Sequence, residues 1–205
     1  MQDMHLGKDV IGLGSSRRVY DLRNGYVAKV ASGELKRMER GLAQNRAEYT
    51  MYETGQYDDI THLAPCQSLS NDETTLVMRK LIRADDYPSM TQKMRMQSLQ
   101  LHRRLKFIDE IFWGAKKGDI PNRIKALLHT SKKEKHAEIR AFTRSKLFKD
   151  LMVIIFQYEL LLGDICRMSS WGYYRGKYVL IDYGGTRTVF NEHYGKTPIG
   201  KGVAK

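Results

Sequence analysis

Two aspartates near the C-terminal end of the sequence, Asp164 and Asp182, have a residue type and a setting that suit chemistry. Asp164 follows an apolar run that ends at Gly163, and Asp182 follows the strand-like segment 178–181. A carboxylate at the end of an element can bind a divalent cation through its oxygens or accept a proton from a hydroxyl. Aspartate beside glycine is also common in plain turns, so this pair alone does not define a site.

A second set of candidate residues lies near the start of the chain. Gly12 and Gly14 precede the strand residue Val19, an Asn-Gly pair then predicts a hairpin turn, and Lys29 lies on the returning strand. Backbone N–H groups at a glycine turn can approach phosphate oxygens because no Cβ intervenes. This end of the sequence therefore predicts a glycine-bearing β-hairpin followed by a strand lysine.

In their order along the chain, these residues resemble the motifs of the protein-kinase-like fold. The glycine hairpin has its trailing Val19, Lys29 stands on the next strand, and Glu48 lies in a helical segment. Asp164 takes the place of the catalytic-loop aspartate, and Asp182-Tyr183-Gly184 is written in place of Asp-Phe-Gly. The resemblance is to compact, divergent kinase-like proteins of bacteria, phages and mobile elements.

This resemblance implies an ATP site. It implies that Gly12 and Gly14 approach the nucleotide phosphates and that Lys29 binds them while it is paired with Glu48. The residues at the end of segment 74–79 would form the hinge that meets the adenine ring. The further nucleotide contacts implied in this way are Val19, Met78, Arg79 and Lys80.

The resemblance also implies a Mg²⁺ ion and a catalytic acceptor of protons. Asp182 would hold the metal, and Asp164 would orient or deprotonate the accepting hydroxyl. Ser169 stands five residues after Asp164, where the family has a metal-binding asparagine, so it is the second candidate metal ligand. Arg17 replaces the third glycine of the hairpin pattern, and its charge can contribute there instead. Leu162-Gly163-Asp164 stands where the family has His-Arg-Asp, so the arginine before this aspartate is absent, which argues against regulation by a phosphorylated activation loop.

We expect an α+β protein with a two-lobed, protein-kinase-like fold. Residues 1–84 would form an N-lobe with a small antiparallel sheet and one helix, and residues 85–190 a reduced, mostly helical C-lobe. Within the second lobe, residues 151–162 are predicted to be the most apolar helix, which aims the following loop at the catalytic aspartate. Residues 191–205 are expected to be a flexible tail.

Composition narrows the class of protein. The 205 residues are 41% hydrophobic and 28% charged, which is typical of a globular chain long enough to bury a core. The two cysteines have no metal-ligand spacing, so we interpret them as reduced packing residues. The N-terminus has no apolar segment of the signal-peptide kind, and the longest apolar run is too short to span a bilayer. We therefore expect no membrane association and a cytoplasmic location, in a bacterium or an infected host cell.

Positive charge is concentrated in residues 102–149. This segment holds 14 Lys and Arg against 5 Asp and Glu, and so carries most of the net charge of +12. A solvated helical face is one explanation, and a docking surface for an acidic protein or a nucleic acid is the other. No nucleic-acid motif is present to choose between these partners.

The sequence thus leaves three functions open. The first is an ATP- and Mg²⁺-dependent phosphotransferase, a protein Ser/Thr kinase whose protein substrate could be the chain itself. The second is a weakly active or inactive kinase-like binding protein that engages an acidic partner through residues 102–149. The third is a small-molecule kinase, which would share the same core residues.

Overall fold

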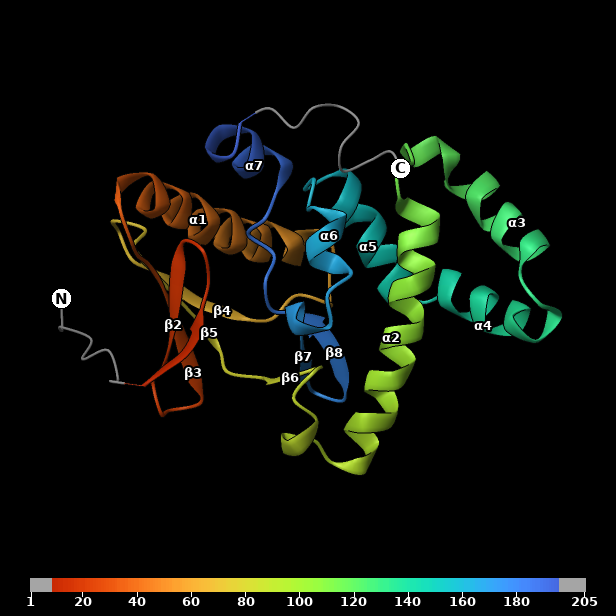
Figure 1. The fold of residues 1–205 in the computed structure, drawn as a ribbon, viewed down its shortest axis with the longest axis horizontal. Coiled ribbons are helices and arrows are strands. Elements are labelled where there is room, and N and C mark those ends of the chain that lie inside the picture. Colours follow the sequence, from red (N-terminus) through yellow and green to blue (C-terminus); the bar gives the residue numbers. More distant parts are fainter. Residues whose placement is uncertain (1–8, 196–205) are drawn as a thin grey trace.

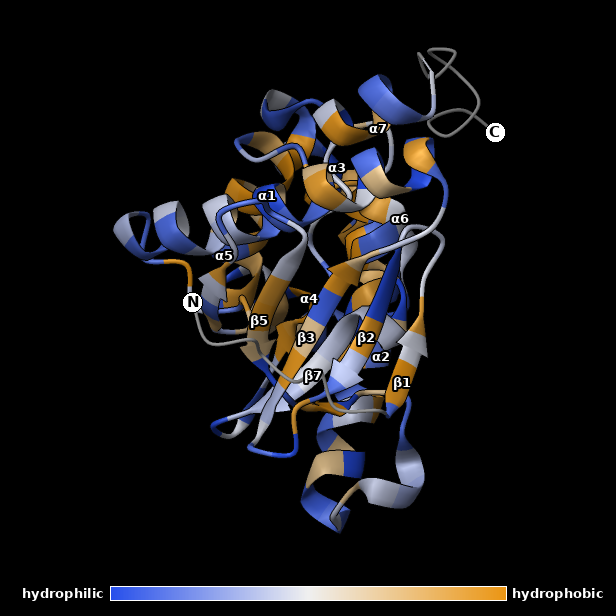
Figure 2. Cartoon of the chain, turned by 90° about the vertical axis from the view of Figure 1, so that its left-hand side faces the viewer, coloured by the Kyte–Doolittle hydropathy of each residue, from blue (hydrophilic) through white to orange (hydrophobic). Residues whose placement is uncertain are grey.

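An antiparallel sheet of five strands forms one end of the protein in the computed structural model, which describes residues 9–195 (Figure 1). The spatial order is β1-β2-β3-β5-β4. Strands that follow one another in sequence are neighbours in this sheet except β3 and β4, between which β5 lies. The strands are β1 (Val10–Leu13), β2 (Arg17–Asp21), β3 (Tyr26–Ala31), β4 (Cys66–Leu69) and β5 (Thr75–Arg79). Figure 2 shows β1 at the edge of this sheet, where its apolar residues Ile11 and Leu13 are exposed.

A long helix, α1 (Leu35–Tyr57), supplies the crossover from β3 to β4 and covers one face of the sheet. Its buried residues recur every three or four positions, which places them on one side of the helix. They are Gly41, Asn45, Glu48, Met51 and Gly55. The polar members of this buried face point to a role beyond packing, because buried polar groups require partners.

The remainder of the chain is mainly helical. Thr91 caps the start of α2 and Ser145 that of α5, each by accepting a hydrogen bond from a backbone N–H of the first turn. The long helices are α2 (Gln92–Phe112), α3 (Ile120–Thr130), α4 (Lys133–Thr143) and α5 (Lys146–Phe156), and α7 (Arg187–His193) packs against α1. The short helices are α6 (Leu162–Ile165) and the 3₁₀ turns η1 (Tyr87–Ser89), η2 (Lys117–Asp119) and η3 (Met168–Ser170).

A second antiparallel sheet of three strands lies against the helices. Its strands are β6 (Ile82–Arg83), β7 (Trp171–Tyr174) and β8 (Lys177–Leu180), in the order β6-β7-β8. One apolar core runs from Val27 in the first sheet through Ile108 and Phe142 to Tyr183 beyond the second. The molecule is therefore a mixed α+β protein in which both sheets share a core with the helices.

The helix predicted for residues 151–162 is shorter than expected. Helix α5 ends at Phe156, and Glu159 has a positive φ of 53°, which takes the chain out of the helical region. Leu160 is buried and forms a β-bridge with Thr186. An extended segment thus buries Leu160, whereas Leu161 and Leu162 are partly exposed. Asp164 lies in the one-turn helix α6 instead of a loop.

The boundaries predicted after residues 84 and 190 fall within packed parts of the structure. Ala84 is fully buried, and its N–H donates to the carbonyl of Trp171 at 2.8 Å. Residue 190 lies inside α7, which continues to His193, so part of the expected tail is helical. Residues 196–205, the rest of that tail, lie outside the described residues. Among residues 9–195, no helix has the length and apolarity needed to cross a membrane.

Asp150 of α5 ties the segment after α1 to the helical part of the protein. Its Oδ2 accepts hydrogen bonds from the N–H groups of Thr61 (2.9 Å) and His62 (3.1 Å) and lies 2.6 Å from His62 Nδ1. Its Oδ1 lies 2.8 Å from Lys146 Nζ. Burial opposes ionisation, but these partners outweigh it and lower the pKa of Asp150 to about 2.

We expect Asp150→Asn to lower the free energy of unfolding by about 1–3 kcal/mol at pH 7, because it removes the charge from a buried, hydrogen-bonded site. A depressed pKa stabilises the folded state above the ordinary value of 3.8, and this contribution is lost as the pH falls through about 2. Urea unfolding at pH 7 and pH 3 measures both effects. Asp59→Asn, at an exposed partner of Lys146, is the control. Equal stability losses in the two variants would contradict the assignment.

Candidate functional site

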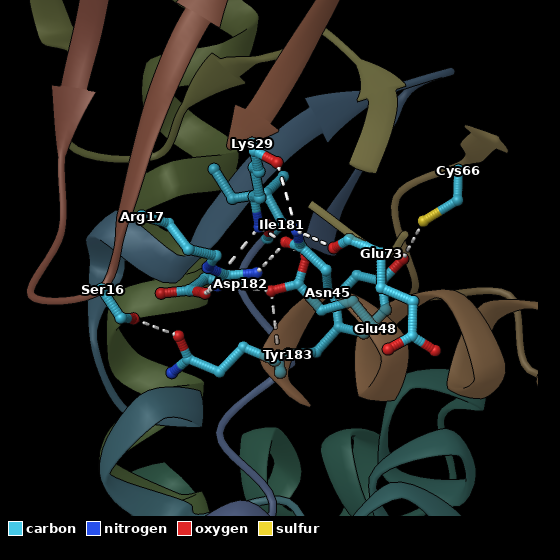
Figure 3. A network of polar contacts seen from close by, with 12 residues as sticks. Ser16, Arg17, Lys29, Asn45, Glu48, Cys66, Glu73, Ile181, Asp182 and Tyr183 are labelled. Carbon is cyan, nitrogen blue, oxygen red and sulfur yellow. Dashed lines mark hydrogen bonds and ion pairs between the residues drawn. The ribbon is translucent and has the colours of Figure 1, made fainter. Parts of the chain in front are cut away.

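Four charged side chains meet between the first sheet and α1 (Figure 3). Lys29 Nζ lies 2.7 Å from Glu48 Oε2, and Arg17 Nη2 lies 2.8 Å from Glu48 Oε1. Arg17 Nη2 also lies 2.9 Å from Asp182 Oδ1, and Lys29 Nζ lies 3.8 Å from the same oxygen. Two cations and two carboxylates, drawn from four separate segments, thus form one network.

Strand register explains why the two cations converge. Val19 pairs with Lys29 and Arg17 pairs with Ala31 across β2 and β3, so Arg17 and Lys29 are diagonal neighbours on the same face. That face is covered by α1, from which Glu48 projects. The hairpin register therefore aims both side chains at one carboxylate.

Because its charges are buried, this network affects the stability of the protein as well as the chemistry of the site. The side chain of Glu48 has no exposed surface, and those of Arg17 and Lys29 are 9% exposed. Glu48 Oε1 also accepts a hydrogen bond from the N–H of Gly184 at 3.1 Å. A buried carboxylate is tolerated only when it is paired and hydrogen-bonded. Each charge here consequently depends on the others.

The Asp-Tyr-Gly triplet is fixed by close packing. The hydroxyl of Tyr183 is buried, donates to the carbonyl of Ala64 at 2.8 Å and lies 3.1 Å from Cys66 Sγ. Burial raises the pKa of Tyr183 well above its ordinary value. At Gly184 a Cβ would lie 2.6 Å from the carbonyl oxygen of Gln44, so only glycine fits this approach to α1. The triplet thus holds its aspartate at a defined place beside the ion-pair network.

A pocket of about 430 Å³ opens next to this network. Asp164 and Asp182 both line it, together with the turn from Gly14 to Arg17 at the tip of the first hairpin. The remaining wall is made by Gln44, Leu161, Arg167, Gly185, Thr186, Val189, Phe190 and Tyr194. Gly185 permits the wall to form, since a Cβ there would lie 2.0 Å from Asp164 Oδ2.

The two carboxyl groups of the pocket have opposite pKa shifts. Burial and the negative charge of Asp182 raise the pKa of Asp164 from 3.8 to about 6, against the opposing charge of Arg167, whose Nη1 lies 3.4 Å away. Burial also opposes ionisation of Asp182, but Lys29 and Arg17 outweigh it and lower its pKa. Pairs of carboxyl groups whose pKa values are driven apart are typical of acid–base sites.

The donor set of this pocket fits a Mg²⁺ ion that arrives with a phosphate ligand. Within residues 9–195 there is no cluster of three or more His, Cys, Asp or Glu that could hold a metal by itself. Mg²⁺ commonly takes only one or two carboxylates and completes its shell with waters and substrate phosphates. Asp182, whose side chain is 51% exposed, and Asp164 could supply those carboxylates.

Of the residues predicted to contact phosphate, only Gly14 lines the pocket. Gly12 lies in β1 and packs against Val19, and neither of them lines it. Lys29 and Glu48 do not line the pocket, and Arg17 is the cation of the network that does.

The predicted hinge residues lie away from the pocket. Met78 is buried in the core, and Lys80 Nζ lies 2.6 Å from Asp21 Oδ2. The guanidinium of Arg79 stacks over the ring of Tyr26, 5.0 Å from its centroid. The pocket therefore does not extend to the end of β5.

The predicted second metal ligand, Ser169, is also outside the pocket. It is exposed on the 3₁₀ turn η3, whereas the wall at this point is formed by Arg167, three residues after Asp164. Asp164 lies in the one-turn helix α6, and Arg167 follows that helix with its Nη1 3.4 Å from Asp164 Oδ1. Spacing taken from the family pattern did not anticipate this turn.

The sequence predicted a contribution from the charge of Arg17, but not its pairing with Glu48 and Asp182, and it did not predict the contribution of Asn45. Asn45 donates to the carbonyls of Glu73 (3.0 Å) and Thr74 (3.1 Å), and its Oδ1 accepts from Arg17 Nη1 at 3.3 Å. A sequence signal for Asn45 exists, because it lies three residues before Glu48 and hence on the same helical face. No comparable signal identifies the inward course of Arg17.

Replacing Arg17 with methionine is expected to raise the pKa of Asp182 toward its ordinary value, because one of the two cations that lower it is removed. Carboxyl ¹³C NMR titration of the variant measures this shift directly. Arg18→Met, at the exposed neighbouring position, should leave Asp182 unchanged. An unaltered Asp182 titration in Arg17→Met would show that the two side chains are not paired in solution.

No family model matches this chain, and no curated protein matches its sequence. The function is therefore inferred from the chemistry of the site itself.

Proposed function

We propose that this protein is an ATP- and Mg²⁺-dependent phosphotransferase of the protein-kinase-like fold, acting on Ser or Thr hydroxyls of proteins, itself included. In this proposal the five-stranded sheet with α1 is the N-lobe, and the helical part is the C-lobe. The observation that carries it is the pocket in which Asp164 and Asp182, with opposite pKa shifts, adjoin the buried Lys29–Glu48 pair.

Asp164 has the properties of a proton acceptor. Its pKa of about 6 leaves it mainly ionised at neutral pH while keeping it more basic than an ordinary carboxylate. Arg167, which also lines the pocket, lies with its Nη1 3.4 Å from Asp164 Oδ1. A hydroxyl that enters the pocket could be oriented by Asp164 and lose its proton to it.

The negative charge of a phosphate would be neutralised by Arg17, by Lys29 and by a Mg²⁺ ion held by Asp182. Arg17 lines the pocket, and its guanidinium would contribute positive charge to a phosphate bound there. Lys29 supports it by holding Glu48. Mg²⁺, when bound, would neutralise charge on the transferring phosphate, with Asp182 as its protein ligand.

Incubation of the purified chain with γ-labelled ATP, Mg²⁺ and general protein acceptors tests the proposal. We expect label to appear on protein, and Asp182→Asn to lower the initial rate by at least about 100-fold because it weakens the metal ligand. Glu110→Gln, an exposed residue of α2, is the matched control. Absence of label on every protein in the wild-type reaction would contradict protein kinase activity, and label in small metabolites alone would favour a small-molecule kinase.

A second candidate is a binding protein that keeps this architecture without efficient transfer. Two observations favour it: Arg17 already pairs with Asp182, the proposed metal ligand, and residues 102–149 carry strong positive charge. Such a protein would engage an acidic protein or a nucleic acid through that segment. Nucleotide binding without transfer, combined with salt-sensitive binding of an acidic partner, would support it over the first candidate.

A further inference from the structure

A shallow groove lies between α3 and α4, at the end of the molecule opposite the five-stranded sheet (Figure 1). Its volume is about 510 Å³. It shares no lining residue with the pocket of the candidate site. Nothing in the proposed phosphoryl transfer uses it, so its chemistry requires a separate explanation.

Helical spacing aligns basic side chains along both walls of this groove. Lys125 and His129 lie four residues apart on α3, and His136 and Arg140 lie four apart on α4, so each pair occupies one helical face. The ring of His136 is fixed, since its Nε2 lies 3.0 Å from the carbonyl oxygen of Ser131 in the connection between the helices. The groove thus has two opposed basic walls.

No carboxylate lines the groove. The two glutamates of α4, Glu134 and Glu138, are not among its lining residues, and within residues 9–195 neither forms an ion pair with Lys125 or Arg140. Uncompensated positive charge in a concave surface attracts an anionic ligand. The groove is therefore one defined candidate binding site within the positively charged segment 102–149.

The floor of the groove decides which kind of anionic ligand it suits. The apolar part of the lining, here called the floor, consists of Ala126, which is exposed, and Leu128, which is partly exposed, so the groove offers an apolar strip beside its basic side chains. A phosphate backbone gains nothing from an apolar strip, and no Phe, Tyr or Trp lines the groove to stack a base. An amphipathic helix with an acidic face can use both features, because its apolar side chains lie on the floor and its carboxylates meet the walls.

We propose that the groove between α3 and α4 binds an acidic amphipathic helical segment of a partner protein. This proposal gives the second candidate function a defined binding site and partner class, but it does not depend on whether the other pocket transfers phosphate. A kinase that recruits its substrate through this groove and an inactive binding protein would both use it in the same way.

Fluorescence anisotropy with the full chain tests the proposal. The probe is a labelled peptide with leucines on one helical face and glutamates on the other, and its twin has glutamine in place of glutamate. We expect saturable binding of the glutamate peptide, at least about 10-fold tighter than its twin. The charge reversals Lys125→Glu and Arg140→Glu together should weaken binding at least about 10-fold.

A matched pair of charge reversals separates the groove from general electrostatics. Arg123 of α3 and Lys133 of α4 are exposed but do not line the groove, so Arg123→Glu with Lys133→Glu makes the same change of net charge. This pair should weaken binding less than about 3-fold, since exposed charges act over longer distances through screened fields. Equal weakening by both pairs would overturn the groove as the site.

A third variant tests the apolar floor. Ala126→Arg fills the strip with a long side chain while it increases the positive charge, so it should weaken peptide binding if the groove is filled by the peptide. Tighter binding in this variant would show a purely electrostatic contact and overturn the proposal. No saturation with the wild-type chain would also overturn it. The proposal would also be overturned if the wild-type chain bound single-stranded DNA more tightly than the peptide and this DNA binding were lost in the Lys125→Glu/Arg140→Glu variant. The ligand class would then be nucleic acid.

Discussion

Replacing Glu48 with alanine is expected to lower the free energy of unfolding by about 3–5 kcal/mol, because removal of one partner leaves buried charges without compensation. Glu48 is the shared partner of Arg17 and Lys29 and also accepts the N–H of Gly184. Asp182 lies close to both cations but is half exposed, so it replaces the lost carboxylate only in part. Urea unfolding at pH 7, followed by circular dichroism, measures the loss.

Two further variants make this result specific. Glu53→Ala removes an exposed glutamate from the same helix and should change the free energy of unfolding by less than about 0.5 kcal/mol. Glu48→Gln keeps the shape and one acceptor, so its loss should lie between those of the two alanine variants. A loss below about 1 kcal/mol for Glu48→Ala would mean that the ion-pair network is solvated in solution.

Replacing Asp164 with asparagine is expected to lower the rate of phosphoryl transfer by about 10²–10⁴-fold, because the side chain can no longer accept a proton. In the wild-type protein the rate should rise with pH as Asp164 ionises, with a midpoint near its pKa of about 6. The residual activity of the variant should lack this pH dependence. Initial rates with labelled ATP across pH 5–8 provide both measurements.

The same substitution is expected to increase stability. A pKa raised in the folded state stabilises the protein below the ordinary value of 3.8, and this contribution is lost as the pH rises through about 6. At pH 7 the ionised Asp164 therefore opposes folding, and its side chain is only 21% exposed. Asp164→Asn should raise the free energy of unfolding at pH 7 by about 1–3 kcal/mol.

Loss of transfer together with a gain of stability separates a catalytic role from a structural one. Replacing a purely structural carboxylate would lower both the rate of phosphoryl transfer and the free energy of unfolding. Replacing a carboxylate with neither role would change neither quantity. Glu110→Gln, already used as the control for transfer, should leave both quantities unchanged. A lower free energy of unfolding for Asp164→Asn would contradict the assignment of Asp164 as a catalytic carboxylate whose ionisation opposes folding.

Much of the first sheet could be predicted because its signals are local. The Asn24-Gly25 pair gives the turn between β2 and β3, and Gly25 has the positive φ of 84° that such turns require. The buried face of α1 follows from residues three and four positions apart. Glu48, which was singled out by the family resemblance, lies on that face. Elements whose cause lies within a few residues were therefore accessible from sequence.

The features that were missed depend on partners distant in sequence. The side chain of Arg17 points inward because it pairs there with Glu48 and with Asp182, which is 165 residues away in sequence. No local sequence pattern predicts a contact over that separation. Helix α5 ends early because Leu160 pairs with Thr186, although its own apolar neighbours favour helix. The pocket wall formed by α7 arises in the same way, from packing against α1. Tertiary contacts outweighed local preference at each of these places.

Calorimetric titration of the purified chain with ATP in the presence of Mg²⁺ tests the central claim most directly. We predict saturable binding of one nucleotide per chain, strengthened by Mg²⁺ and weakened at least about 10-fold by Asp182→Ala, because that carboxylate is the proposed metal ligand. Wild-type protein that takes up no nucleotide, or an Asp182→Ala variant that binds it equally well with Mg²⁺, would contradict the account of this pocket as a nucleotide-phosphate site.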